Sequence, residues 1–250
     1  MTTTAHRKTG TRKPRGRPAP RASDGVFYPY STGEPMGESN AHLQCIRWIL
    51  DALEDLLRDR PDVSVHGDMF WYWQEGRPDL TRAPDAMVFF GVPMDPVRKS
   101  FKSWEHGGAV PDVIIETASA AQKALLFGDM LRDYQGQGVR EYFVFDWSGQ
   151  YLDQPLYGYR LRGARYQPIR PRADGGLVSN QLRAVLRPDR RMLRFLKAAD
   201  DSPILTRLEQ VAAARAQADA TSQEVAQKDA ELKRALALLR KAGIDPDAPK

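Results

Sequence analysis

Nearly all aromatic, valine and isoleucine residues of this 250-residue chain lie in one stretch, residues 28–200. A core can form only where such residues gather, because burial of apolar side chains is the main favourable contribution to folding. Hydrophobic residues make up 42% of the chain, which is enough for one domain and excludes disorder throughout. We therefore expect a folded domain at residues 28–197, between two segments of different composition.

The spacing of apolar residues in this stretch predicts helices that alternate with strands. Glycine and proline mark residues 91–110 as a loop. Helices are expected at residues 38–58 and 120–135, and strands at residues 63–73, 86–90, 113–115, 141–146, 156–161 and 165–169. This order predicts a mixed β-sheet flanked by helices, which is an α/β fold.

The first segment, residues 1–27, has almost nothing to bury and is expected to be a disordered basic tail. Residues 1–22 carry seven positive charges and no acid, whereas the whole chain carries +5, so the rest of the chain is slightly acidic. A short motif in the tail resembles the core of an AT-hook: Arg15, Gly16, Arg17 and Pro18. Two arginines separated by glycine suit the narrow minor groove of A·T-rich DNA, so we expect the motif to bind DNA. The alternative is a tail that only adds solubility.

The last segment predicts one long helix at residues 203–243. No glycine or proline follows Pro203 until Gly243, and Ser202-Pro203 is a favourable helix start. Apolar residues recur every seven positions, as in one column of a coiled coil: Val211, Ala218, Val225, Leu232 and Leu239. The second apolar column that a coiled coil needs is interrupted by polar residues in its middle. A homodimer through this helix is one interpretation, and a single helix that lies on the domain or projects freely is the other.

Two observations bear on where the protein is found. The chain has no run of 18 apolar residues and its basic N-terminus lacks an apolar core, so we expect neither a membrane span nor a secretory signal. Cys45 is the single cysteine, which excludes a disulfide framework and a cysteine cluster for a metal ion. We therefore expect a reduced, cytoplasmic protein.

Two acidic residues, Asp85 and Glu116, lie at the ends of strands that are otherwise apolar. A buried carboxylate is costly unless it is hydrogen-bonded, paired or bound to a cation. Carboxylates from neighbouring strands at one sheet edge suit Mg²⁺ or Mn²⁺, which would lower the pKa of a bound water and stabilise a phosphate under attack. The alternative is that backbone amides or arginines satisfy both acids.

Several sequence blocks carry a likeness to a known family: YPYSTGEPMGESNAHLQCI, VHGDMFWYWQEGRPDLTRAPDAMVFFGVP, SWEHGG, PDVIIETAS and DYQGQGVREYFVFD. Together they resemble the Uma-two family of restriction endonucleases, in the PD-(D/E)XK nuclease-like superfamily. The resemblance implies a restriction-endonuclease-like fold and a DNA endonuclease that depends on Mg²⁺, with Mn²⁺ as a second candidate ion. It also implies that Asp85 and Glu116 are catalytic metal ligands and that Glu38 is a further ligand.

The chain departs from the family at the lysine that would orient the nucleophile and stabilise phosphate charge. The orthodox position, two residues after Glu116, holds Ala118. The helix position where the lysine otherwise stands in this family holds Met130. Lys123 lies two turns earlier on the same helix face, about 10 Å away, and is the candidate catalytic substitute. Its alternative is a solvated helix lysine.

The missing lysine leaves three functions open. The first is metal-dependent DNA hydrolysis, weakened because loss of one charge-stabilising group typically costs a factor of about 10²–10³. The alternative is a catalytically inactive DNA-binding protein, which Ala118 and Met130 favour and the two retained acids oppose. The third is a coiled-coil scaffold whose domain binds protein. His42, on the first helix, is expected to be a partly buried, hydrogen-bonded residue rather than a catalytic one.

Overall fold

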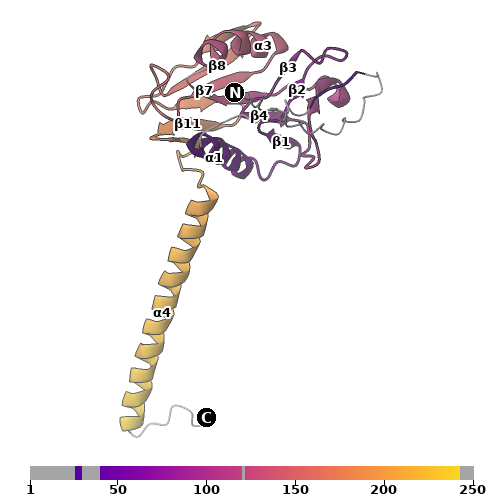
Figure 1. Cartoon of the computed structure of the whole chain (residues 1–250). Coiled ribbons are helices and arrows are strands. Elements are labelled where there is room, and N and C mark those ends of the chain that lie inside the picture. The colour runs from indigo at the N-terminus through magenta and orange to yellow at the C-terminus, as the bar shows by residue number, and fades with distance from the viewer. Residues whose placement is uncertain (1–25, 30–39, 120–121, 243–250) are drawn as a thin grey trace, which may run out of the picture. The chain divides into compact units, whose positions relative to one another are not determined.

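The computed structural model describes residues 26–29, 40–119 and 122–242 (Figure 1). The chain divides into two units, Met1–Ser202 and Pro203–Lys250. The AT-hook-like motif and Glu38 both lie outside the described residues. The roles expected for them therefore stay predictions.

A six-stranded sheet forms the centre of the first unit (Figure 1). β6 and β7 are parallel, and every other neighbouring pair in this sheet is antiparallel. The predicted mixed sheet is confirmed. The strands lie in the order β1 (Val63–His66), β4 (Ala86–Phe90), β6 (Val113–Thr117), β7 (Glu141–Phe145), β8 (Leu156–Arg162) and β9 (Arg165–Pro168).

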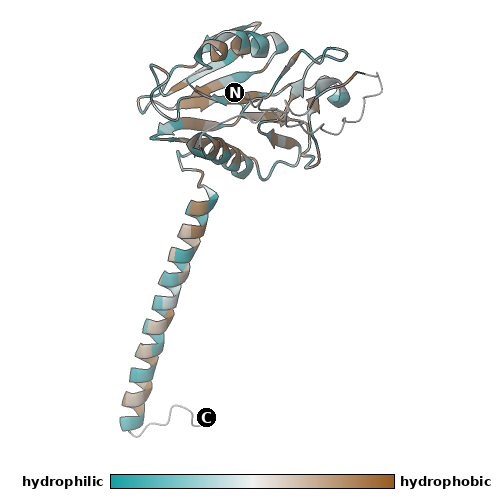
Figure 2. Ribbon diagram, in the orientation of Figure 1, coloured by the Kyte–Doolittle hydropathy of each residue, from teal (hydrophilic) through white to brown (hydrophobic). Residues whose placement is uncertain are grey.

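Consecutive residues of β6 point to opposite faces of this sheet, and each face has its own helix. Thr117 contacts His42 of α1 (Asn40–Leu56), whereas Glu116 contacts Tyr134 of α3 (Asp129–Gln137). The two helices therefore cover opposite faces, and this part of the α/β prediction is also confirmed. Figure 2 shows the strands between them as the hydrophobic interior of the domain.

Two three-stranded sheets complete the first unit. One has the order β3 (Thr81–Arg82), β2 (Trp71–Tyr72), β5 (Phe101–Lys102), and the other has the order β10 (Leu177–Ser179), β11 (Ala184–Asp189), β12 (Met192–Lys197). The sequence pattern predicts no strand at residues 177–197, and this omission was wrong. α1 contacts β12 as well as β1, β4 and β6, so the first described helix packs against the last strand of the unit.

The prediction of one strand at residues 63–73 was wrong, because β1 ends at His66 and β2 belongs to another sheet. The break is at Gly67, where an added Cβ would lie 2.8 Å from the carbonyl oxygen of Asp85 and 2.6 Å from Leu50. The Asp68 amide then donates to the Pro84 carbonyl (3.0 Å). The chain therefore passes so close to the backbone before β4 that it needs a residue without a side chain.

The loop predicted at residues 91–110 contains β5 and a 3₁₀ helix, η1 (Ser103–His106), so this prediction was wrong in part. Phe101 stacks on Phe89 with ring centroids 3.8 Å apart, and Trp71 Nε1 donates to Ser103 Oγ (2.9 Å). These contacts join segments that are distant in the sequence. A strand of two residues has no periodicity from which it could be recognised.

The helix predicted at residues 120–135 is two helices in the described residues, α2 (Lys123–Leu126) and α3. Gly128 lies between them with a non-helical backbone (φ −111°, ψ −102°). A Cβ at this position would lie 2.5 Å from the carbonyl oxygen of Ala124. The chain therefore bends at Gly128 and starts α3 in a new direction.

The second unit contains α4 (Arg207–Lys241), so the expected long helix is present. It begins after Thr206 rather than at Ser202-Pro203, because Thr206 and Glu209 form a capping box in which each side chain binds the other's backbone amide. The predicted apolar column is exposed, with Val225 61% and Leu232 57% accessible. Pairing with a second copy stays a prediction. Among the helices of the described residues, none has both the length and the apolar character needed to cross a membrane.

Candidate active site

The structure brings the two predicted acids, Asp85 and Glu116, together. β4 and β6 are antiparallel with Ala86 opposite Ile115, so Asp85 falls opposite Glu116 at the edge of this strand pair. Thr117 binds Asp85 Oδ2 twice, from its backbone amide (2.7 Å) and from its hydroxyl (2.5 Å). The Asp85 amide in turn donates to Glu116 Oε2 (3.3 Å). Reciprocal hydrogen bonds across the two strands therefore hold both carboxylates.

Glu116 is the more buried of the two acids, with 4% of its surface exposed. The Tyr134 hydroxyl donates to its Oε1 (2.6 Å). Burial raises the pKa of Glu116 well above its usual range, and the negative charge of Asp85 raises it further; the hydrogen bond from Tyr134 acts in the opposite direction. A metal-free Glu116 therefore binds a proton far more readily than an exposed glutamate.

On the other face of the sheet, His42 extends the hydrogen-bonded chain. Its Nε2 contacts the Thr117 hydroxyl, and its ring stacks on Trp147 with centroids 5.8 Å apart. His42 is buried and hydrogen-bonded, as expected from the sequence. Burial, and then the charge of Asp85, raise the pKa of the neighbouring Cys45 thiol to about 12, so the single cysteine stays a neutral core residue.

Arg82 is a residue near the acids that the sequence reasoning missed. It lies in β3 opposite Trp71, whose ring stacks on Tyr134 with centroids 6.3 Å apart. Its guanidinium forms an ion pair with Asp133, the residue before Tyr134 on α3. Burial is the main influence on the pKa of Glu116 and raises it, and the positive charge of Arg82 opposes that rise. Within the described residues, Arg82 Nε is a buried donor without a hydrogen-bond partner.

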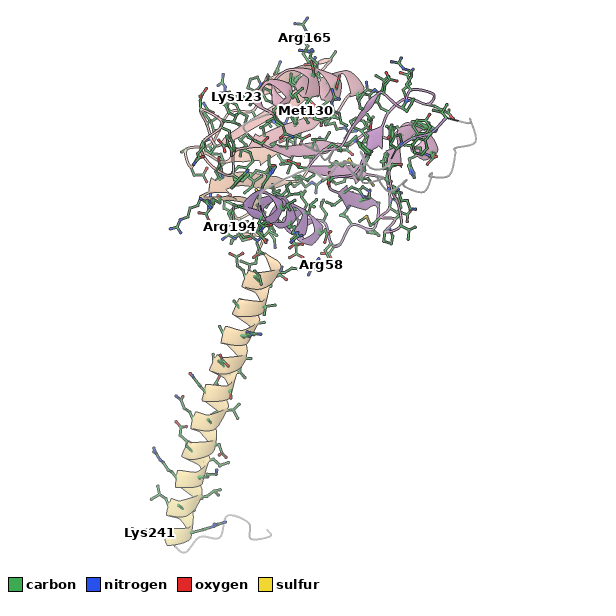
Figure 3. The ribbon with its side chains drawn as sticks, viewed as in Figure 1. Arg58, Lys123, Met130, Arg165, Arg194 and Lys241 are labelled. Atoms are coloured by element: carbon green, nitrogen blue, oxygen red, sulfur yellow. The ribbon has the colours of Figure 1, made fainter. Side chains whose placement is uncertain are left out.

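Both residues at the expected lysine positions belong to the hydrophobic side of the sheet. Ala118 is fully buried in a cluster with Tyr134 and Tyr142, and Met130 packs against the same cluster. Lys123 begins α2 with 54% of its side chain exposed, and its ion pair is with Asp153 at 3.9 Å. Figure 3 labels Met130 and Lys123 on this side of the domain. Lys123 therefore faces solvent and pairs with Asp153 rather than with either of the two acids.

Residues 20–187 match the Uma2 (Uma-two) family, described as "Putative restriction endonuclease". The chain belongs to the Uma2 family. Among solved structures, a "putative nuclease belonging to DUF820" from Anabaena variabilis ATCC 29413 is 14% identical to this chain, with a TM-score of 0.43 over 61% of this chain and 81% of that chain. No curated protein matches. The family expected from the sequence blocks is thereby confirmed.

The oxygen ligands of this Uma2 site fit a hard divalent cation. Mg²⁺ is commonly held by one or two carboxylates, with water and substrate phosphate completing its shell, and Asp85 and Glu116 are two such carboxylates on adjacent strands. No group of three or more His, Cys, Asp or Glu side chains within the described residues could hold a metal ion. Glu38, the third ligand expected from the resemblance, lies outside them. The two acids thus suit an open site rather than a closed protein cage.

Tyr134→Phe is expected to destabilise this Uma2 domain by about 1–2 kcal/mol, because it removes the donor to a buried carboxyl oxygen and leaves that oxygen without its partner. Urea unfolding at neutral pH measures the change. Tyr159→Phe is the matched control, because no hydrogen bond of its hydroxyl is found among the described residues. Equal unfolding midpoints for the two variants would show that the Tyr134 hydroxyl does not support Glu116.

Proposed function

We propose that this Uma2-family protein is a metal-dependent DNA endonuclease and that Asp85 and Glu116 hold its Mg²⁺, for which Mn²⁺ is a second candidate. The observation that carries the proposal is the reciprocal hydrogen bonding of two carboxylates across β4 and β6, one of them deeply buried. A fold that needed only stability would gain from an apolar pair at this place, because burying carboxylates is costly. Their presence favours a cation between them and a substrate.

Three side chains orient the two acids. Thr117 fixes Asp85 Oδ2, which leaves the orientation of the carboxylate set before any ligand arrives. Tyr134 fixes Glu116 Oε1, and His42 fixes the Thr117 hydroxyl from the opposite face. Bound Mg²⁺ supplies a water of lowered pKa and positive charge for the phosphate. The protein holds the two carboxylates rigidly. The buried Glu116 must lose its proton before it can bind the metal.

The role of the missing lysine falls to one of two cations. Lys123, the candidate from the sequence, is half-exposed and pairs with Asp153, whereas Arg82 acts on the pKa of Glu116 and braces α3 through Asp133. These contacts favour Arg82, as a positioning residue that keeps Glu116 closer to its ionised, metal-binding form. Lys123 remains the alternative, and its replacement by alanine in the same assay compares the two.

Plasmid cleavage by the purified chain in Mg²⁺, Mn²⁺ and EDTA tests the proposal. We expect metal-dependent nicking or linearisation that falls roughly 10²–10³-fold in Asp85→Asn, because the amide keeps the shape of Asp85 but supplies one fewer anionic ligand. Asp79→Asn is the matched control, since Asp79 forms an exposed ion pair with Arg77. Cleavage that persists in EDTA or in Asp85→Asn would mean that a contaminating nuclease, not this site, cuts the DNA.

The second candidate function is a DNA-binding protein that has lost catalysis. Its support is the pair of apolar residues at the lysine positions, Ala118 and Met130, both packed on one hydrophobic cluster. Retarded DNA without cleavage in either metal would favour it. DNA binding through residues 15–18, a homodimer through α4 and a cytoplasmic location all stay predictions.

A further inference from the structure

A basic groove lies on the α1 side of the domain, apart from the two acids. It measures about 570 Å³ and opens between α1 and the hairpin that joins β11 to β12. Figure 3 labels Arg194, which belongs to this hairpin, beside α1. The groove is lined by Trp48, Asp189, Arg190, Arg191, Met192 and Arg194.

The charge in this groove is unbalanced. Asp189, its one carboxylate, pairs with Arg194 at 3.2 Å. Arg190 and Arg191 are both exposed at the tip of the hairpin, and neither has an ion pair within the described part of the chain. Trp48 is half-buried on the flank of α1. Two unneutralised guanidinium groups thus face solvent beside the ring of an accessible tryptophan.

The hairpin holds Arg190 in an unfavourable backbone conformation. Asp189 pairs with Met192, so Arg190 and Arg191 form a two-residue turn. Arg190 has φ +55°, a region that glycine or asparagine occupies at little cost and that a long side chain disfavours. A glycine would make an easier turn here but would remove one of the two charges.

We propose that this groove binds a single strand of DNA, with Arg190 and Arg191 on its phosphates and Trp48 stacked on a base. An anionic backbone complements the unpaired arginines, and an aromatic ring beside them is the usual platform for an unpaired base. Trp48 is six residues from His42, about 9 Å along α1, and His42 contacts the residue that holds Asp85. α1 therefore connects the groove with the residue that holds Asp85. The proposal rests on the proposed function and extends it to substrate binding.

The test compares two matched variants of the full chain, Arg190→Gly and Arg183→Gly. Both residues are exposed, both have positive φ (+55° and +52°), and each substitution removes one positive charge and one strained side chain. Arg183 lies outside the groove. Fluorescence anisotropy with a labelled 30-nucleotide single strand in EDTA measures binding without cleavage, and thermal melting measures stability.

We expect both variants to melt at or above the wild-type temperature, and Arg190→Gly alone to bind the strand about tenfold more weakly, with a shallower salt dependence. Trp48→Leu is expected to weaken binding by roughly fivefold or more through lost stacking. Equal affinities of the two glycine variants would overturn the proposal. Binding of a polyglutamate peptide to the groove with the same affinity as the DNA strand would also overturn the proposal. If Arg190→Gly alone loses affinity for the strand but the wild type never cleaves DNA, the proposed groove is supported and the proposed nuclease function is rejected.

Discussion

Glu116→Gln is expected to make the protein more stable and, at the same time, to remove most of its cleavage of DNA. The pKa of Glu116 in the folded chain is raised, chiefly by burial and then by the charge of Asp85. The wild type therefore loses stability as the pH rises above the ordinary glutamate pKa of about 4.3 towards the raised value. The amide has no proton to lose, so the variant keeps a flatter profile across that window.

Thermal melts in EDTA between pH 4 and pH 8 measure this effect. At neutral pH we expect the free energy of unfolding of the variant to exceed that of the wild type by about 1 kcal/mol, or roughly 2–4 °C in melting temperature. At pH 4 the two proteins should nearly coincide, because Glu116 is then largely protonated in both the folded and the unfolded wild type. Added Mg²⁺ should raise the melting temperature of the wild type and leave the variant unchanged.

Cleavage by Glu116→Gln should fall about 10²–10³-fold. Glu105→Gln is the control, since Glu105 is half-exposed and pairs with Lys102 on the surface. A variant that melts below the wild type at neutral pH in EDTA would contradict the argument, because it would mean that the fold stabilises the ionised form of Glu116.

Arg82→Gln is expected to move the pH dependence of cleavage upward and to lower activity at neutral pH about tenfold. Burial and the negative charge of Asp85 raise the pKa of Glu116, whereas the positive charge of Arg82 lowers it. Removing that positive charge therefore raises the pKa of Glu116 further. Ionised Glu116 is then reached only at higher pH, and the alkaline side of the profile should recover activity. Initial cleavage rates between pH 6 and pH 9 at saturating Mg²⁺ measure the shift.

Asp133→Asn separates charge from packing in this experiment. Both variants break the ion pair between Arg82 and Asp133, but only Arg82→Gln removes the positive charge. If both shift the profile upward equally, Arg82 acts only as a brace for α3. Arg77→Gln, which breaks an exposed pair with Asp79, should leave the profile in place.

The carboxylate pair could be predicted because each acid lies at the end of an apolar strand. A short apolar run next to an acid can be recognised from the local sequence alone. Arg82 could not, because β3 is two residues long and half-buried, and its ion pair joins it to a helix about fifty residues later. The contact of Tyr134 with Glu116 could not be predicted either. Its hydrogen bond depends on the start of α3 after Gly128, which helical spacing alone does not reveal.

The β11–β12 hairpin was missed for a different reason. Hairpin prediction relies on glycine, asparagine or aspartate in a two-residue turn, and here the turn is Arg190-Arg191. The two arginines that made the turn unrecognisable from the sequence also give the groove its positive charge. The unusual turn residues therefore explain both why the hairpin was missed and why its groove is basic.

The packing of α1 against β12 has a consequence for the order in which the domain can be completed during synthesis. α1 leaves the ribosome early, whereas β12 is the last strand of the domain to be made. At about 5–20 residues per second the delay is on the order of ten seconds or more. Until β12 is made, α1 can pack only on β1, β4 and β6, and one of its contacts in the finished domain is missing. The first described helix therefore reaches its final packing only after the last strand of the unit has been made.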